Sequence, residues 1–426
     1  MSPKKKVTTR NPFFIKPAIP DRYFCDRRED TRKIISLIES GNNVVLMADR
    51  RIGKSSLLYH ILHCDEIRSQ YNTLYVDING TTTSEEFINA MKNAISNPLY
   101  STFPADFSNR FNKITKEYSG KLKFEQGPIS LSSEFKKQQT LQDKSAIEEI
   151  FKLFQNTKKP NLITFDEFQQ IERYDEKITA LLRSKIEMLA NTNFIYAGSS
   201  KHLLASMFIS YNQPFYNSSQ IYGLKKIPIK TYASFCEKMF GLGDRNMEPE
   251  IAETVYNLFF GTTQMMQQVM NRAYDMTERN DTIDEAVIKE AIEDIIYDRS
   301  ISYETLLSSL KLKPGHKNLL YAIGVEGIAN NITSQAMIAK YNLGAPSTVY
   351  KRLQALSTGD NNIITEIAKD NYILTDRFFE LWIAQQAGLF DLKLKTAKTL
   401  FQKFQEIEKK NNIKIKNNLK PTIPHF

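Results

Sequence analysis

The stretch M-A-D-R-R-I-G-K-S-S-L-L, residues 47–58, combines the residue types that hold phosphate groups. Backbone N–H groups at the start of a helix present positive potential to phosphate, and Gly53 lets the backbone approach closely. Lys54 adds a positive charge, and the hydroxyl of Ser55 can complete the shell of a Mg²⁺ ion. Ala48 stands where such a loop usually begins with glycine, and a strand exit with negative φ accommodates its methyl group. We predict nucleotide contacts from Asp49, Arg50, Arg51, Ile52, Gly53, Lys54, Ser55 and Ser56.

Two carboxylates at the end of an apolar strand form a second candidate element. The run L-I-T-F-D-E, residues 162–167, ends in Asp166, which would hold Mg²⁺ directly or through water, and Glu167, which would orient and deprotonate an attacking water. The alternative is a strand that leads into a solvated turn. After a further strand, Ser199 or Ser200 falls where a polar side chain would sense a terminal phosphate, and the alternative there is a serine-rich loop. The predicted catalytic residues are Glu167, Asp166, Lys54 and Ser199.

The elements that must position these residues follow from the pattern of apolar runs. Between residues 30 and 229, short β-branched or apolar runs alternate with helical periodicity, which is typical of a parallel sheet covered by helices. The segment 97–144 breaks this rhythm, and we interpret it as a polar insertion that is helical in part and mobile elsewhere. The pattern predicts an α/β fold whose strands are 44–48, 73–79, 161–167, 193–199 and 221–229.

The sequence pattern of the second half of the chain predicts two helical units. Residues 230–298 carry mostly helical patterns and indicate a small bundle, followed by a connector at 301–314. Three further helical runs and two short strand-like runs around residues 368–370 predict a winged helix-turn-helix, with Pro346 in the first turn of its third helix. The predicted domains are 1–229, 230–300, 301–388 and a basic tail at 389–426.

The third helix of the winged unit has an apolar face and a polar face. Val349, Leu353 and Leu356 share the apolar face. The polar face offers hydroxyls, a phenol and a cation, which could read a groove of DNA. Because this face is only mildly basic, packing or the docking of a protein partner is the alternative. The candidate DNA-binding residues are Ser347, Thr348, Tyr350, Lys351 and Gln354.

Composition limits the class of protein. The chain has 426 residues, 41% of them apolar and 25% charged, which is ordinary for a folded protein of two or three domains. Three scattered cysteines favour a reducing compartment and make a zinc site an unfavourable interpretation. No apolar run approaches the ~20 residues that span a membrane, so we expect a cytoplasmic protein without a membrane partner.

The net charge of +9 lies in the two ends of the chain. Residues 1–10 contribute +4 and residues 391–426 contribute +6, which leaves −1 for the part between them. Lysine-rich ends can contact the phosphates of DNA in a salt-sensitive way, but such segments are also common as solvated tails. Apolar residues among the lysines of the tail predict a docking helix with a frayed end.

The chain resembles the prokaryotic "archaeal ATPase" family, in the AAA+/STAND branch of P-loop ATPases, over roughly residues 11–388. The resemblance implies ATP rather than GTP, with Mg²⁺, on a P-loop NTPase sheet ordered 5-1-4-3-2. It also implies a helical lid and a C-terminal winged helix-turn-helix. The motifs that carry it, in chain order before the winged helix, are D-R-Y-F-C-D-R-R-E-D, A-D-R-R-I-G-K-S-S-L-L, L-I-T-F-D-E, F-I-Y-A-G-S-S and Q-P-F-Y.

Two departures from the family pattern concern nucleotide contacts. Asp49 stands where family members commonly have proline, which affects the rigidity of the loop. Related lids touch the nucleotide through a Gly-x-Pro, whereas this chain has G-T-T at 261–263, so a contact through Gly261 is implied. The resemblance also implies that Arg22 and Tyr23 lie in the segment that the family packs on the adenine side.

The sequence leaves two functions open. One is a Mg-dependent ATPase whose nucleotide state regulates contact with DNA or a protein partner, as a single chain or a homo-oligomer. The other is a nucleotide-loaded, DNA-binding regulator with negligible hydrolysis. A missing catalytic arginine can cost about 10³–10⁵ in rate, so hydrolysis can be slow or stimulated by a partner. The arginines eligible for that role are Arg50, Arg51, Arg173, Arg183, Arg245 and Arg272.

Overall fold

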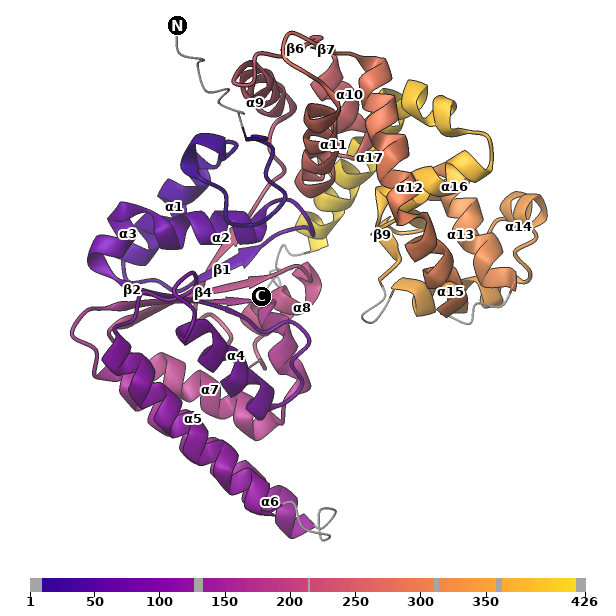
Figure 1. Cartoon of the computed structure of the whole chain (residues 1–426). Coiled ribbons are helices and arrows are strands. Elements are labelled where there is room, and N and C mark those ends of the chain that lie inside the picture. The colour runs from indigo at the N-terminus through magenta and orange to yellow at the C-terminus, as the bar shows by residue number, and fades with distance from the viewer. Residues whose placement is uncertain (1–9, 126–132, 214, 310–313, 358–361, 419–426) are drawn as a thin grey trace, which may run out of the picture. The chain divides into compact units, whose positions relative to one another are not determined.

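The computed structural model describes residues 10–125, 133–213, 215–309, 314–357 and 362–418 (Figure 1). The chain forms two compact units. One comprises residues 16–226, and the other joins the segment up to Ile15 with the chain from Ile227 onward.

A parallel five-stranded sheet forms the centre of the first unit, with the strands in the order β2-β3-β4-β1-β5. This is the predicted order 5-1-4-3-2, which is therefore confirmed. The last strand is shorter than the predicted 221–229, because Pro228 precedes a helix that begins at Ile229. The strands are β1 Val44–Met47, β2 Asn72–Asp77, β3 Asn161–Asp166, β4 Thr192–Gly198 and β5 Gln220–Gly223.

Helices cover both faces of this sheet. Successive strand residues point to opposite sides, so they pack into two different cores. Val44 and Leu46 pack with α1, α2 and α3, whereas Val45 packs into the larger core under α4 to α8. Figure 1 shows these two helical layers above and below β1, β2 and β4. The helices are α1 Arg28–Glu39, α2 Lys54–His63, α3 Asp65–Gln70, α4 Ser84–Ile95, α5 Ala105–Glu125, α6 Ser133–Gln155, α7 Glu176–Met188 and α8 Lys201–Ile209, with 3₁₀ turns η1 Asp21–Tyr23 and η2 Phe168–Arg173.

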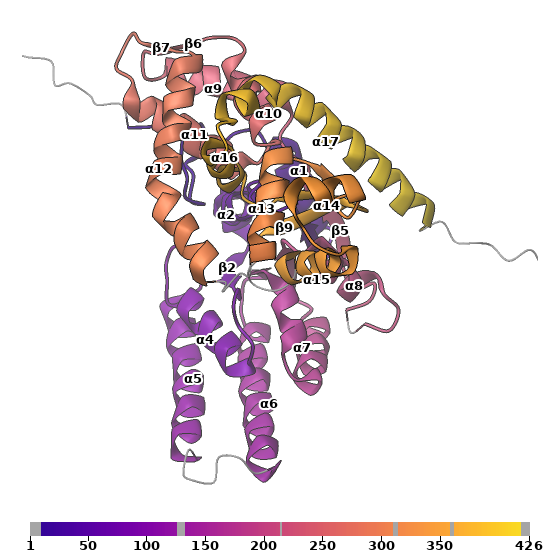
Figure 2. The ribbon, with the colours of Figure 1, turned by 90° about the vertical axis from the view of Figure 1, so that its right-hand side faces the viewer.

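The predicted insertion at 97–144 contains a helical hairpin made by α5 and α6, which run side by side (Figure 2). Its base is fixed by the buried carboxylate of Asp143, which accepts hydrogen bonds from Ser84 at the start of α4 and from Tyr118 on α5. The helical part of the prediction is confirmed. The rest of the prediction falls partly on residues 126–132, which lie outside the described residues.

The second unit begins with a helical bundle made by α9 Ile229–Gly241, α10 Ile251–Leu258, α11 Thr263–Met276 and α12 Glu285–Ser309. A short parallel pair, β6 Asn246–Met247 and β7 Thr282–Ile283, joins two of its loops. The predicted connector at 301–314 is wrong for residues 301–309, which continue α12. The helix continues there because Tyr303 is buried against the rings of Phe379 and Trp382, at 5.0 and 5.8 Å between centroids.

The winged helix-turn-helix follows in the predicted order. Pro346 begins its third helix, as predicted. Asn371 and Tyr372 of β10 pair with both β8 and β9 in a three-stranded antiparallel sheet, which forms the wing. The elements are α13 Pro314–Glu326, β8 Ala329–Asn330, α14 Gln335–Tyr341, α15 Pro346–Ser357, β9 Ile364–Ala368 and β10 Asn371–Leu374.

Two C-terminal helices, α16 Arg377–Gln386 and α17 Phe390–Asn418, bind the winged helix to the bundle. Phe404 of α17 stacks on Phe260, which confirms the predicted docking of the tail. The predicted fraying concerns an end of which residues 419–426 lie outside the described part of the chain.

A buried group of charges reinforces this junction. The Arg377 guanidinium pairs with Glu380 and donates to the carbonyl of Leu258 in α10 at 3.0 Å. The Lys393 ammonium lies 3.5 Å from Glu380 and donates to the carbonyl of Val325 in α13. Because the group contacts α10, α13, α16 and α17, it ties the bundle and the winged helix into one unit.

In the part of the chain that the structure describes, none of the helices combines the length and the apolar character of a membrane-spanning segment.

Candidate nucleotide-binding site

The loop between β1 and α2 has the shape of a phosphate cradle. Gly53 has φ +92°, which favours glycine, and a Cβ placed on it would have no atom within 4 Å, so one side of the loop is open. It is the N-cap residue of α2 and provides no side-chain cap. The first N–H groups of α2 therefore remain available to an anion. Ala48 is fully buried at the strand exit and is not among the residues with positive φ, so its methyl group is accommodated as expected.

Arg27 braces the outer part of this loop. Its guanidinium, only 5% exposed, donates to the carbonyl of Ile52 at 2.9 Å and to the carbonyl of Lys225 at 2.6 Å, and it pairs with Asp30. Nothing in the sequence pattern singled out Arg27, although it lies in the motif D-R-Y-F-C-D-R-R-E-D before the first strand. Its role becomes visible only when residues far apart in the chain meet.

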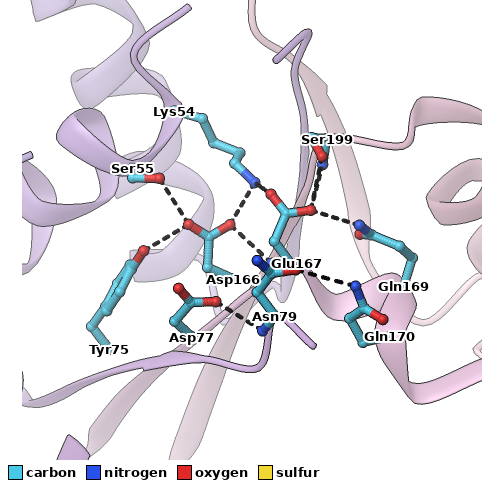
Figure 3. A network of polar contacts seen from close by, with 10 residues as sticks. All are labelled: Lys54, Ser55, Tyr75, Asp77, Asn79, Asp166, Glu167, Gln169, Gln170 and Ser199. Atoms are coloured by element: carbon cyan, nitrogen blue, oxygen red, sulfur yellow. Dashed lines mark hydrogen bonds and ion pairs between the residues drawn. The ribbon is translucent and has the colours of Figure 1, made fainter. Parts of the chain in front are cut away.

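Lys54 and Asp166 meet at the C-terminal edge of the sheet (Figure 3). The Lys54 Nζ lies 2.5 Å from Asp166 Oδ1 and 2.6 Å from Glu167 Oε1. The Asp166 Oδ2 accepts hydrogen bonds from Ser55 at 2.9 Å and from Tyr75 at 2.6 Å. The structure thus brings four predicted site residues together and adds Tyr75, which the sequence did not point to.

Glu167 takes part with both of its carboxylate oxygens. Oε1 accepts from Lys54, and Oε2 accepts from Ser199 at 2.8 Å and from Gln169 at 2.6 Å. Of the two predicted serines, Ser199 is the one that contacts Glu167. Glu167 itself has φ +57°, an uncommon conformation for a residue with a side chain, which turns the chain directly after the strand. Strained residues of this kind cluster at functional sites.

The charges of the site stabilise one another. Burial favours the neutral form of Asp166, but the Lys54 ammonium and the hydroxyls of Tyr75 and Ser55 outweigh it and hold the pKa of Asp166 below its usual value. The same competition lowers the pKa of Glu167. For Lys54, burial lowers the pKa, yet the two carboxylates raise it by more. At neutral pH the three groups are therefore charged, and the two carboxylates leave one negative charge in excess of the Lys54 ammonium.

A cavity of about 760 Å³ adjoins this network on the side of α4. Ser55, Tyr75 and Asp77 line it, together with residues 16–18. Its volume lies within the range of small-molecule sites. A ligand in this cavity would therefore be able to contact Ser55 and Tyr75, which both donate hydrogen bonds to Asp166.

The other residues predicted to contact nucleotide lie in two places. Asp49, Arg50, Arg51 and Ser56 are part of the cradle loop or its helix, and Arg50 and Arg51 are exposed. Gly261 belongs to the second unit, so its nucleotide contact remains a prediction. The local structure explains why a glycine stands at this position, since it has φ +69° and a Cβ on it would lie 2.7 Å from the ring of Tyr256.

Several of the candidate arginines have structural partners. Arg183 pairs with Glu187, and Arg272 pairs with Asp294 and Asp298. Arg245 donates to Thr277, and Arg22 lies over the ring of Tyr23 at 4.4 Å. These contacts do not select a catalytic arginine, and the adenine-side role of Arg22 and Tyr23 remains a prediction.

The third helix of the winged unit divides as predicted. Val349, Leu353 and Leu356 are buried. The candidate DNA-binding residues all lie on the exposed side: Ser347, Thr348, Tyr350, Lys351 and Gln354.

Known structures share this arrangement of elements. Over 87% of this chain and 99% of the other, the structure is similar to the Walker-type ATPase paby2304 of Pyrococcus abyssi, with 20% identity and a TM-score of 0.56. The fold is the AAA+ P-loop fold. It is also similar to the ORC2 protein of Aeropyrum pernix in its ADPNP-ADP complexes, with 14% identity, 93% and 98% coverage and a TM-score of 0.53.

A third known structure and one family model also match this chain. The ORC1 protein of Aeropyrum pernix, solved in complex with DNA, is similar with 13% identity, 90% and 98% coverage and a TM-score of 0.51. Residues 301–385 match the family model of a probable winged helix domain. No curated protein matches the sequence. The AAA+ P-loop fold with a C-terminal winged helix is thereby established, as the resemblance implied.

Proposed function

We propose that this protein is a Mg-dependent ATP-binding and ATP-hydrolysing switch that couples its nucleotide state to the binding of DNA or a protein partner. One observation carries the proposal. Lys54 and Ser55, at the start of a helix with open N–H groups, meet Asp166 and Glu167 from a distant strand. This is the set of a cation, a hydroxyl and two carboxylates that in-line phosphoryl transfer requires.

The chemistry of these donors fits a magnesium nucleotide. Magnesium is usually bound by one or two carboxylates together with phosphates and waters. Asp166 and Ser55, already 2.9 Å apart, would hold the ion. Among the described residues, no group of three or more His, Cys, Asp or Glu side chains could hold a metal, which suits an ion that arrives with its phosphates. Bound there, the ion would neutralise charge on the terminal phosphates.

The residues of the chain then have distinct roles in the proposed reaction. Lys54 exchanges its carboxylate partners for phosphate oxygens, and the N–H groups at the start of α2 hold the same phosphates. Once Lys54 turns away, Oε1 of Glu167 is free to accept a proton from an attacking water. Ser199, which lies between Glu167 and the end of β4, would sense the terminal phosphate.

ATP, rather than GTP, is proposed from the family resemblance. Arg22 and Tyr23 would pack on the adenine side, and Gly261 would contact the nucleotide from the lid. The ORC2 structure named above was solved with ADPNP and ADP, which is consistent with an adenine nucleotide in this fold. Membership of the STAND branch remains a prediction.

The proposed output is the second unit. The exposed polar face of α15 offers Tyr350 and Lys351 to a partner, and DNA is one candidate because the ORC1 relative was solved with DNA. The lysine-rich ends would add salt-sensitive attraction to phosphates. A protein partner, including a second copy of the chain, is the other candidate.

A non-hydrolysing regulator is the second candidate function, and one observation favours it. Both oxygens of Glu167 are engaged, by Lys54 on one side and by Ser199 and Gln169 on the other. A base held in this way does not act until Lys54 leaves it.

Turnover separates the two functions. Purified protein with Mg-ATP should release phosphate, and chelation of Mg²⁺ with EDTA should stop the release. Saturable ATP binding by calorimetry without phosphate release would select the regulator. No heat from ATP, ADP or GTP in folded protein would refute both.

A further inference from the structure

Gln169 contacts Glu167 from the 3₁₀ turn that follows β3. Its side chain is 8% exposed, and its Nε2 donates to Glu167 Oε2 at 2.6 Å (Figure 3). A carboxylate only accepts hydrogen bonds, so the amide nitrogen must be the atom that faces it. Its Oε1 is buried and has no hydrogen-bond partner in the described part of the chain. A buried atom of this kind needs a structural explanation.

Gly198, the last residue of β4, makes room for this amide. A Cβ on Gly198 would lie 2.2 Å from Gln169 Oε1, closer than atoms can approach. Gly198 is not among the glycines with positive φ, so its backbone would accept other residues. The absence of a side chain at this position therefore serves the approach of Gln169 and not a turn.

We propose that Gln169 is a positioning residue for Glu167. The inference rests on the proposed function, in which Glu167 acts as the general base. Oε2 has two donors, Gln169 and Ser199, whereas Oε1 has Lys54. When Lys54 turns to phosphate, Oε1 loses its donor. Oε2 keeps Gln169 even if the single hydroxyl hydrogen of Ser199 turns to the terminal phosphate. The carboxylate thus stays oriented, with its free oxygen directed to the side that Lys54 has left.

The first experiment separates orientation from nucleotide binding. Gln169→Met keeps the length of the side chain and removes the hydrogen bond, and Gly198→Ala pushes the amide away without altering it. Each should lower kcat by about tenfold or more, because small errors in the placement of a reacting group are costly. The affinity for a fluorescent ATP analogue should stay within about twofold of the wild type, since Gln169 bonds to Glu167 and the methyl group of Gly198→Ala would lie nearest to the side chains of Gln169 and Leu204.

Two further variants sharpen this measurement. The double variant should be no slower than the slower single variant, because both changes remove the same contact. Gln170→Met is the matched control, since the Gln170 amide donates to Asn79 at 3.3 Å and not to Glu167. It should keep the wild-type kcat.

The second experiment needs no nucleotide. In the nucleotide-free chain, the urea midpoints of Gln169→Met, Glu167→Ala and their double variant form a cycle that measures the coupling of the two side chains. We expect a coupling between Gln169 and Glu167, and none between Gln170 and Glu167. Additive midpoints for Gln169 and Glu167 would overturn the contact.

The outcomes distinguish this inference from the proposed function. The absence of phosphate release by the wild type would overturn the hydrolytic function, whereas wild-type turnover in Glu167→Gln would show that Glu167 is not the general base. Loss of turnover in Glu167→Gln, with an unchanged kcat in both Gln169→Met and Gly198→Ala, would overturn the positioning role alone.

Discussion

The nucleotide site and the polar face of α15 both depend on short polar motifs, but the structure treats them in opposite ways. At the site, Lys54 and Asp166 are 7% and 3% exposed and form an ion pair with each other. On α15, Tyr350 is 54% exposed, and Ser347 and Lys351 lie in solvent beside it.

This contrast in burial predicts how each region would bind a ligand. Buried charges must stay paired, so a ligand at the site has to replace contacts that the chain already makes. Exposed groups on α15 have little intramolecular bonding to lose, so binding there adds contacts without breaking buried ones. Single substitutions should therefore have large effects at the first region and small ones at the second.

Lys54→Ala should have the largest effect and abolish measurable ATP binding and turnover. It removes the cation of the cradle and leaves Asp166 and Glu167 without their common partner. Titration with a fluorescent ATP analogue tests this, and Lys33→Ala is the control, because Lys33 forms an exposed pair with Glu29. Binding of wild-type strength in Lys54→Ala would remove Lys54 from the site.

Glu167→Gln should retain ATP binding while lowering kcat by about 10²–10⁴, the usual contribution of a general base. Phosphate release under saturating Mg-ATP measures it. Glu176→Gln, on an exposed stretch of α7, should turn over like the wild type. Equal turnover in the Glu167 and Glu176 variants would contradict the role of Glu167.

Arg377→Ala tests the same contrast between buried and exposed charges in the second unit. Removing one partner of a buried ion pair typically costs about 3–5 kcal/mol in the free energy of unfolding. Lys289→Ala, which breaks an exposed pair with Asp391, should cost about 0–1 kcal/mol. Urea unfolding measures both, and similar costs would show that burial does not govern these pairs.

Lys351→Ala should have the smallest effect, a loss of a few fold in DNA affinity at low salt. If Lys351 neutralises one phosphate, the slope of log affinity against log salt should fall by about 1. Lys340→Ala is the control, because Lys340 already pairs with Glu326. Mobility shifts across a salt series would reveal it, and no retention of DNA by the wild type would favour a protein partner.

The parts of the fold that were predicted well are those encoded locally. Four of the five strands were found within a residue or two at either end, and Pro346 begins its helix, because apolar runs and backbone preferences act over a few residues. The fifth strand and the connector at 301–314 were wrong in extent. There, packing of Tyr303 against Phe379 and Trp382 extends a helix that the local pattern does not indicate.

The candidate site shows the same division. The loop with Lys54 and the pair Asp166 and Glu167 were visible in the sequence, because each sits at the junction of a strand and a turn. Tyr75 was not, since it reaches Asp166 only because β2 pairs with β3 and sets Asp77 opposite Asp166.

Residue types and their spacing specify the chemistry available to this protein: a glycine, lysine and serine after one strand, two carboxylates after another, and a polar helix face near the C-terminus. The tertiary structure decided which of these groups touch. It placed Lys54 beside Asp166, Arg27 on the carbonyl of Ile52 and Arg377 on the carbonyl of Leu258 in α10. The physical reason is that buried polar groups require partners, and a chain supplies those partners from residues that only folding brings together.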